Sequence, residues 1–227
     1  MSDYDAWAPV YDAWTGGMPE DVAHYVSLAC EADGPVVELA VGTGRVAIEV
    51  ARATGKPVLG IDSSAAMLEI ARERSAGLRI ELRLGDMRGF ELEEPAALIY
   101  VPGRSLLHLH GWHEKRRVFE RVAGSLRPGG RFAFKAFVFS HAVAARLDGT
   151  TQDQNGVVHT LNYVPAESRI DITRDDGATL SLWWATKEEW DGLLEVSGLE
   201  VEALYGGFAH EPFTDESLEF LYVARKP

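Results

Sequence analysis

The feature that most constrains the fold of this chain is a glycine turn directly after a short apolar strand. Residues 36–41 read Val-Val-Glu-Leu-Ala-Val, and Gly42-Thr43-Gly44-Arg45 follow them. Because glycine has no side chain, Gly42 and Gly44 let the backbone approach a bound molecule closely. The helix expected after Gly44 points its free backbone N–H groups at the same place. This arrangement is typical of an α/β sheet edge that holds a nucleotide-like ligand.

An acid at the end of the next expected strand suits a ligand that contains ribose. Residues 57–62 read Pro-Val-Leu-Gly-Ile-Asp, which puts Asp62 20 residues after Gly42. At this spacing an acidic side chain binds ribose hydroxyls in nucleotide-binding folds. The pattern Gly42-x-Gly44-x-x-Ala47 also satisfies the loose dinucleotide signature. Asp62 therefore fits either a dinucleotide or an adenosyl ligand.

Further motifs favour an adenosyl ligand that has no pyrophosphate. The strand expected at 78–84 leads into Gly85-Asp86-Met87, which offers a carboxylate for an exocyclic amine and a thioether to lie on an aromatic base. Glu38 lies four residues before Gly42, where a carboxylate can meet a cationic amine. Residues 126–130, Leu-Arg-Pro-Gly-Gly, end a helix and precede another apolar strand.

These four motifs, in this order, resemble those of the class I S-adenosylmethionine-dependent methyltransferases of the small-molecule type. The resemblance covers residues from about 36 to 135 and implies S-adenosylmethionine as the cofactor. Ala40 stands where the family prefers glycine, and its extra methyl group should narrow the pocket without closing it. The residues that the resemblance assigns to cofactor binding are Tyr11, Glu38, Ala40, Gly42, Gly44, Arg45, Asp62, Ser63, Met67, Asp86, Met87 and Val101.

A short repeat marks the N-terminus, where Tyr4-Asp5-Ala6-Trp7 recurs as Tyr11-Asp12-Ala13-Trp14. It resembles the N-terminal lid of small-molecule methyltransferases, in which a tyrosine hydroxyl reaches the carboxylate of the cofactor. Tyr11 matches that tyrosine better than Tyr4 does. Pro9 argues against one continuous helix through both copies. Trp7 and Trp14 are expected to pack rather than to bind a ligand.

Strands and helices alternate along most of the chain, which predicts a Rossmann-like α/β fold with a seven-stranded, mostly parallel sheet covered by helices on both faces. Residues from about 157 to 185 change to hairpins and predict a small antiparallel insert. Strands are expected near 35–40, 57–62, 78–84, 96–101, 130–138, 199–205 and 218–225, and helices near 21–31, 45–53, 64–75, 113–126 and 186–197.

We expect a single methyltransferase domain over residues 1–227. Its expected parts are an N-terminal lid and helix (1–34), a cofactor-binding core (35–138), an antiparallel substrate-side insert (139–185) and a C-terminal helix and hairpin of the sheet (186–227).

Composition narrows the class of substrate. The net charge is −13, from 35 acids against 22 lysines and arginines, and such a chain lacks the basic surface that nucleic acid requires. The partner is therefore expected to be a small-molecule acceptor, with no nucleic acid and no membrane. The single Cys30 excludes an internal disulfide and a cysteine-rich zinc site. No secretory signal is evident, so the expected location is cytoplasmic. The sequence does not decide between a monomer and a homodimer.

Catalytic and substrate-binding candidates lie after the fourth and fifth expected strands, because open α/β sheets bind ligands at the carboxyl ends of their strands. His141, where the chain enters the insert, is the first candidate for a base, and His108 lies nearer the cofactor. Arg104 is a candidate for an acidic substrate group, and aromatic residues of the insert and final hairpin are expected to wall an apolar pocket. Those expected at the acceptor are Tyr163, Trp183 and Phe208.

The predicted activity is in-line transfer of a methyl group to nitrogen or oxygen of a small molecule. No clustered acids beyond Asp86 suggest a metal, so none is expected. An NAD-dependent oxidoreductase is the first alternative, although no Tyr-x-x-x-Lys motif is evident. A non-catalytic S-adenosylmethionine-binding regulator is the second. Methylation of a peptide or protein end is the third, and it is favoured only if the pocket mouth is wide and acidic.

Overall fold

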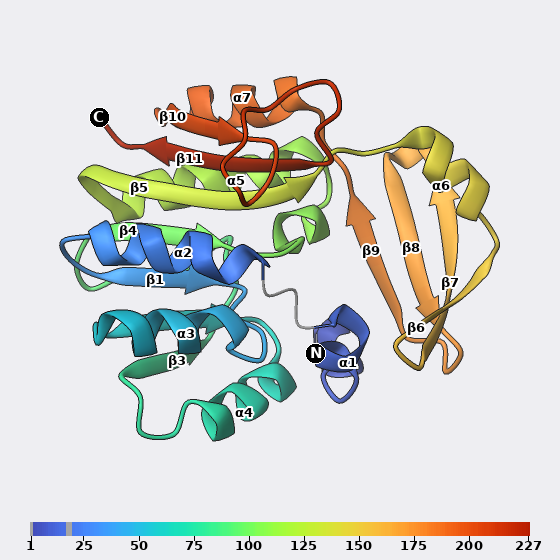
Figure 1. Cartoon of the computed structure of the whole chain (residues 1–227), viewed down its shortest axis with the longest axis horizontal. Coiled ribbons are helices and arrows are strands. Elements are labelled where there is room, and N and C mark those ends of the chain that lie inside the picture. Colours follow the sequence, from blue (N-terminus) through green and yellow to red (C-terminus); the bar gives the residue numbers. More distant parts are fainter. Residues whose placement is uncertain (1, 17–19) are drawn as a thin grey trace.

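The structure is a computed structural model that describes residues 2–16 and 20–227. Its largest element is a seven-stranded sheet in the order β10-β11-β5-β4-β1-β2-β3 (Figure 1). All pairings are parallel except those of β11, which runs antiparallel to both β5 and β10. The strands are β1 (Val36–Leu39), β2 (Val58–Asp62), β3 (Ile80–Leu84), β4 (Ala96–Val101), β5 (Leu126–Phe137), β10 (Glu200–Tyr205) and β11 (Glu219–Arg225).

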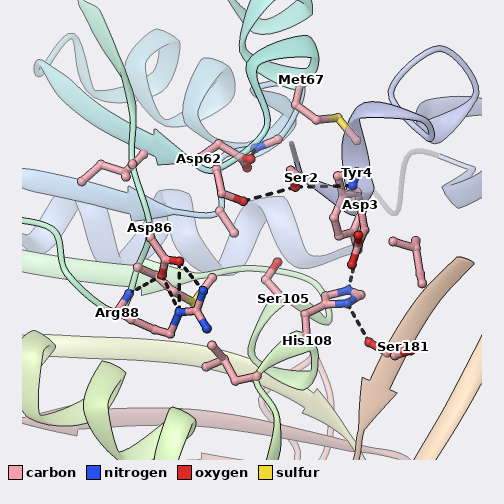
Figure 2. Close-up of a pocket in the computed structure, with 18 of the residues that line it drawn as sticks. Ser2, Asp3, Tyr4, Asp62, Met67, Asp86, Arg88, Ser105, His108 and Ser181 are labelled. Atoms are coloured by element: carbon pink, nitrogen blue, oxygen red, sulfur yellow. Dashed lines mark hydrogen bonds and ion pairs between the residues drawn. The ribbon is translucent and has the colours of Figure 1, made fainter.

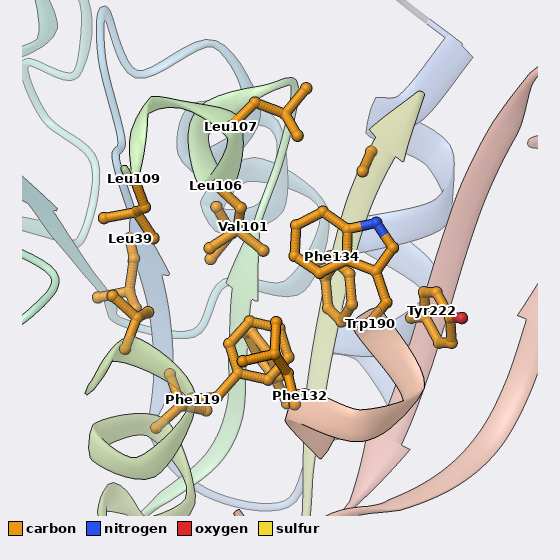
Figure 3. Packing of buried hydrophobic residues seen from close by; sticks show 14 of the residues in the cluster. Leu39, Val101, Leu106, Leu107, Leu109, Phe119, Phe132, Phe134, Trp190 and Tyr222 are labelled. Atoms are coloured by element: carbon orange, nitrogen blue, oxygen red, sulfur yellow. The ribbon is translucent and has the colours of Figure 1, made fainter. Parts of the chain in front are cut away.

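Helices cover both faces of this sheet, as the alternation of strands and helices predicts. Side chains of a strand point alternately to its two faces, and Val36 packs with one hydrophobic cluster while Val37 packs with the other. The first cluster includes side chains of α2 (Glu20–Glu31), α3 (Arg45–Thr54) and α4 (Ala65–Arg74). The second includes side chains of α5 (Gly111–Ser125) and α7 (Lys187–Val196), with Phe119 and Trp190 at its centre (Figure 3).

A second, four-stranded antiparallel sheet lies beyond the carboxyl ends of the main strands (Figure 1). It has the order β6-β7-β8-β9 and follows the short helix α6 (His141–Leu147). The buried side chains Ile172, Leu180 and Leu182 join it to the larger of the two hydrophobic clusters. The strands are β6 (Thr151–Gln154), β7 (Val157–Val164), β8 (Arg169–Arg174) and β9 (Thr179–Trp183).

The N-terminal segment, residues 2–16, packs between the two sheets. It forms a short 3-10 helix, η1 (Asp3–Asp5), and a short helix, α1 (Tyr11–Thr15), with Pro9 in the turn between them. Toward the main sheet, Ser64 Oγ donates to Asp5 Oδ1 at 2.6 Å. Toward the small sheet, Arg174 Nη1 donates to the backbone oxygen of Ala6 at 2.8 Å. The segment therefore contacts the core and the insert together.

Several elements differ from the sequence-based expectation. β5 begins at Leu126 rather than near 130, since Leu126 already pairs with Ala96 and the Pro-Gly-Gly residues form an irregularity inside the strand. The helix α6, the strand β6 and the 3-10 helix η2 (Ser105–His108) had not been predicted. All three are short and lie in segments without a clear hydrophobic period. None of the helices in the described parts of the chain is long and apolar enough to cross a membrane.

Candidate functional site

A cavity of about 500 Å³ lies at the carboxyl ends of β1, β2 and β3 (Figure 2). This is the place where open α/β sheets bind ligands. The N-terminal segment, η2 and β9 form its other walls. Of the residues expected to bind the cofactor, those that line this cavity are Tyr11, Ala40, Gly42, Asp62, Ser63, Met67, Asp86 and Met87.

The backbone after β1 adopts the left-handed conformation at two nearby positions. Gly42 has a φ of 55°, and Ala40, which is not glycine, also has a φ of 55°. A residue with a Cβ pays roughly 1–2 kcal/mol for this conformation. Alanine at position 40 therefore costs backbone strain. The expectation from the sequence concerned only the space that its methyl group takes in the pocket.

Asp62 is fixed at the end of β2 by backbone donors. The Gly42 N–H donates to Oδ2 at 2.8 Å, and the Ser64 N–H donates to Oδ1 at 2.8 Å. Burial raises the pKa of Asp62, and these hydrogen bonds oppose the rise. The glycine turn and the acid 20 residues later thus meet in space, and together they set the floor of the cavity.

Asp86 is engaged by a residue that the sequence analysis had not singled out. Arg88 Nε lies 2.9 Å from Asp86 Oδ1 and 3.0 Å from Oδ2 (Figure 2). Arg88 also forms an ion pair with Glu114 of α5. The Arg88 guanidinium holds the pKa of Asp86 below its usual range. Asp86 and Arg88 both line the cavity, where the pair forms part of the rim beside Met87.

Four expected cofactor residues do not line this cavity. Gly44 is the N-cap residue that directly precedes α3, and its φ is 83°. Arg45 forms a two-pronged ion pair with the buried Asp21, at 2.5 and 2.7 Å. The backbone oxygen of Val101 accepts from the Tyr25 hydroxyl at 3.3 Å. Glu38 is the fourth, and its surroundings are unusual for a carboxyl group.

Glu38 is 1% exposed, two residues before Ala40. Burial raises its pKa to about 8, with the Tyr100 hydroxyl and the Arg45 guanidinium opposing the rise. Its Oε2 atom has no hydrogen-bond partner among the described residues. An unpartnered buried carboxyl oxygen is costly, so this atom marks a place where a bound donor would be stabilising.

His108 is held between the N-terminal segment and β9. Its Nδ1 lies 2.9 Å from the backbone oxygen of Ser181, and its Nε2 lies 2.5 Å from the Tyr4 hydroxyl (Figure 2). A carbonyl oxygen only accepts, so Nδ1 carries the proton of the neutral ring and Tyr4 donates to Nε2. Burial lowers the pKa of His108 to about 4, the Ser181 carbonyl opposes this, and the charges of Arg104 and Lys115 add to it.

A second cavity adjoins the first across this pair. The residues common to both linings are Tyr4, Tyr11, Ser105, His108 and Leu180. Beyond them, the second cavity is lined by Trp14, Arg104 and apolar side chains of β8 and β9. Trp14 had been expected only to pack. The sequence named Arg104 and His108 as candidates, and the fold brings both to the same cavity.

The remaining candidates lie elsewhere. His141 and Tyr163 do not line either cavity, and His141 Nδ1 lies 2.6 Å from the Tyr163 hydroxyl. Trp184 stacks on Phe139 beside them, at 3.7 Å between ring centroids. Its neighbour Trp183, the last residue of β9, lines the first cavity instead.

Phe208 lies under the ammonium group of Lys135, which is 5.3 Å from its ring centroid. It lines neither of the two cavities. Within residues 2–16 and 20–227, no group of three or more His, Cys, Asp or Glu side chains is arranged to hold a metal ion.

Tyr4, Arg88 and Ser181 also line the first cavity, although none of them was among the predicted site residues. Tyr4 belongs to the same N-terminal repeat as Tyr11, so the repeat could have predicted that both tyrosines line the site. No pattern marks Ser181, because it contributes a backbone oxygen that any residue type would supply.

Comparison with known proteins links this site to one reaction class. A family model described as a methyltransferase domain matches residues 36–130. The cypemycin N-terminal methyltransferase of a Streptomyces species is 24% identical over 84% of this chain and 82% of its own length. The dTDP-4-amino-2,3,4,6-tetradeoxy-D-glucose N,N-dimethyltransferase of Saccharopolyspora spinosa is 27% identical over 75% and 73%.

Solved structures agree with these matches. The CcbJ methyltransferase from Streptomyces caelestis superposes with a TM-score of 0.80 at 25% identity, over 96% of this chain and 95% of that one. An amino pentose methyltransferase from Micromonospora echinaspora, CalS10, was solved with S-adenosylmethionine bound and superposes with a TM-score of 0.71 at 21% identity, over 96% and 97%. These matches favour S-adenosylmethionine over NAD and an enzyme over a non-catalytic binding module.

Proposed function

Since the chain is a class I S-adenosylmethionine-dependent methyltransferase of the small-molecule type, we propose that it methylates an amine nitrogen of its acceptor. The observation that carries this proposal is the Tyr4–His108 pair, which lies where the two adjoining cavities meet. In this proposal the first cavity, of about 500 Å³, holds the cofactor, and the second, of about 80 Å³, holds the end of the acceptor that extends past Tyr4 and His108.

The residues of the first cavity fit S-adenosylmethionine. Asp62, at the end of β2, would bind the ribose hydroxyls, and Asp86 with Met87 would bind the adenine. Glu38 lies buried outside the lining of this cavity, and the proposal assigns it no contact with the cofactor. Tyr11 would close the site from the N-terminal segment. When bound, the cofactor supplies a methyl group on a positively charged sulfur, which the acceptor displaces in line.

Tyr4 and His108 would orient the acceptor nitrogen. The Tyr4 proton is directed to His108 Nε2, which leaves the lone pairs of the Tyr4 oxygen free to accept a hydrogen bond from an acceptor N–H. That contact would turn the nitrogen lone pair toward the methyl group. The nitrogen–carbon bond forms as the carbon–sulfur bond breaks, and the nitrogen then releases a proton to water. Positioning and exclusion of water supply most of the acceleration in such a step.

The electrostatics of this pair favour nitrogen over a hydroxyl oxygen. Burial lowers the pKa of His108 to about 4, so the ring is too weak a base to remove the proton of an alcohol or phenol. A free amine is nucleophilic without such a base. The positive charges of Arg104 and Lys115 that disfavour a charged His108 also disfavour an ammonium ion beside it and favour the free amine. Both relatives compared above are named for methylation at nitrogen or at a peptide N-terminus.

The test is a methyl-transfer assay with S-adenosylmethionine that carries a carbon-13 label in its methyl group. Small amines are paired with alcohols of the same skeleton, and the labelled methyl carbon is assigned to nitrogen or oxygen by NMR. We expect the label on nitrogen, with S-adenosylhomocysteine formed in equal amount. A label on hydroxyl oxygen would contradict the proposal. The Asp62→Ala variant, in which both products should be lost together, controls for transfer without the enzyme.

A further inference from the structure

The charge of the residues that line the second cavity differs in sign from the net charge of the whole chain. The chain has a net charge of −13, yet no aspartate or glutamate is among the described residues that line this cavity. Arg104 is the one arginine or lysine among them. The positive lining is therefore a local property, which the overall composition does not predict.

Arg104 lies near enough to Glu219 that its charge opposes the rise that burial causes in the pKa of that carboxyl group, but the two side chains do not form an ion pair. The Arg104 side chain makes no ion pair and no hydrogen bond within the described residues, although its guanidinium lies 5.2 Å from the ring centroid of Phe137. A guanidinium that rests on an aromatic face keeps its edge N–H groups available. Many arginines of this acidic chain are paired with carboxylates, as Arg45 and Arg131 are. Arg104 differs because it is unpaired and lines a cavity that has no aspartate or glutamate among its described lining residues, so a carboxylate of the acceptor is a candidate for its counter-ion.

The position of Arg104 relative to the reacting centre can be inferred from its electrostatic effect. Burial raises the pKa of Tyr4 well above its usual range, and the Arg104 charge opposes that rise. The same charge contributes to the lowered pKa of His108. The guanidinium is thus near Tyr4 and His108, and all three side chains line the second cavity.

We propose that Arg104 binds a carboxylate of the acceptor, so that the substrate is a small amine that also bears a carboxylate and an apolar body. The amine would lie beside Tyr4 and His108, and the apolar part would pack on Ile172, Leu180 and Leu182. This inference rests on the proposed function, because it assigns the second cavity to the acceptor.

The geometry of the site favours a carboxylate over a phosphate. A single guanidinium matches a carboxylate with two parallel hydrogen bonds. A phosphate dianion is commonly held by several cations or by a row of backbone N–H groups, and the second cavity offers one cation. A cationic group at this end of the acceptor would be repelled by Arg104, because no carboxylate among the described lining residues screens the charge.

The experiment measures binding to protein saturated with S-adenosylhomocysteine, so that no turnover is required. Apolar amino acids such as L-phenylalanine, L-leucine and L-proline are titrated in parallel with their primary amides, and phenyl phosphate is added as a phosphate probe. We expect the carboxylates to bind at least tenfold more tightly than their amides. Arg104→Gln should abolish this preference, Arg104→Lys should keep part of it, and Arg121→Gln, an exposed arginine of α5, should leave it unchanged.

Three results would overturn the inference: equal binding of acids and amides, a preference that survives in Arg104→Gln, or tighter binding of phenyl phosphate than of every carboxylate. If S-adenosylhomocysteine binds but no carboxylate of the panel does, the inference fails while the cofactor assignment stands. If S-adenosylhomocysteine itself does not bind, the proposed function fails first. Its affinity in Arg104→Gln should equal that of the wild type, because Arg104 does not line the first cavity.

Discussion

The two adjoining cavities are built from different parts of the chain and differ in charge. The first lies on the ends of three neighbouring parallel strands, and its lining includes Asp3, Asp62 and Asp86. The second is formed by the N-terminal segment, η2 and the small sheet, and its lining contains Arg104 and no carboxylate. The difference suits a cofactor that carries positive charge and an acceptor that carries negative charge.

The two cavities also differ in how their residues are held in place. Asp62 is held by two backbone N–H donors from the turns after β1 and β2, whereas the second cavity depends on contacts between separate segments, such as Tyr4 with His108. Changes near the first cavity are therefore expected to act on cofactor affinity. Changes in the second are expected to act on turnover and on the choice of acceptor.

Replacing the acid buried beneath the cofactor cavity should have the largest effect. The folded state holds the Glu38 proton up to a pKa of about 8, compared with 4.5 for the free group. Its contribution to the free energy of unfolding is complete below pH 4.5 and is lost as the pH rises to about 8. Glu38→Gln should therefore gain stability relative to the wild type over this range, on the order of 5 kcal/mol.

Urea unfolding of both proteins across that pH range measures this difference. His24 and His108, whose pKa values burial lowers to about 4, act in the opposite direction below pH 6.5. Both proteins share these histidines, so their effect cancels in the comparison. A wild-type minus variant difference that does not change with pH would show that Glu38 is not protonated in the folded state.

Changes to the floor of the first cavity should weaken cofactor binding next most strongly. Asp62→Ala and Gly42→Val should each weaken S-adenosylmethionine binding at least tenfold, which is about 1.4 kcal/mol. Valine at position 42 would need a φ of 55° and would extend into the open space of the cavity. Gly55, at the end of α3, has a φ of 64° and equally open surroundings.

Gly55→Val is therefore the matched control for backbone strain. It should lower the unfolding temperature as Gly42→Val does while leaving cofactor affinity unchanged, both measured by calorimetry. If folded Gly42→Val and Asp62→Ala bind S-adenosylmethionine as tightly as the wild type does, the cofactor assignment is wrong.

Variants of the two tyrosines of the N-terminal repeat should distinguish an effect on turnover from an effect on cofactor binding. Tyr4→Phe removes the donor to His108 Nε2 and should lower kcat about fivefold, roughly 1 kcal/mol, with little change in cofactor affinity. Tyr11 makes no side-chain hydrogen bond within the described residues, and Tyr11→Phe should mainly weaken cofactor binding. Steady-state kinetics with each variant test this division, and an identical pattern for both would break it.

Residues outside both cavities should matter least. His141→Ala and Phe208→Ala should change kcat/KM less than about twofold, roughly 0.4 kcal/mol, because neither side chain lines a cavity. The initial rate of S-adenosylhomocysteine release is the measurement. A tenfold loss in His141→Ala would restore His141 as a candidate base and require the insert to close over the site.

The order of motifs was enough to predict the main sheet and its helices, since apolar strands, glycine turns and helices alternate with short connections. The neighbourhood of Gly42 and Asp62 was predictable for the same reason, because adjacent parallel strands end at one edge. The meeting of Tyr4, His108 and Ser181 was not. These residues lie 104 and 73 positions apart, and only the packing of η1 and β9 against η2 brings them together.

Short elements and backbone strain also escaped prediction. The helix α6 has seven residues and one buried side chain, Ala144, which is too little for a hydrophobic period to emerge. The left-handed conformation of Ala40 is set by the turn around it, and residue type alone gives no sign of it.

The most direct test is calorimetric titration of the wild type and Asp62→Ala with S-adenosylmethionine, S-adenosylhomocysteine and NAD, side by side. The account predicts that the wild type binds the first two and not NAD, and that Asp62→Ala binds both at least tenfold more weakly. Binding of NAD, or equal affinity of the two proteins for S-adenosylmethionine, would contradict it.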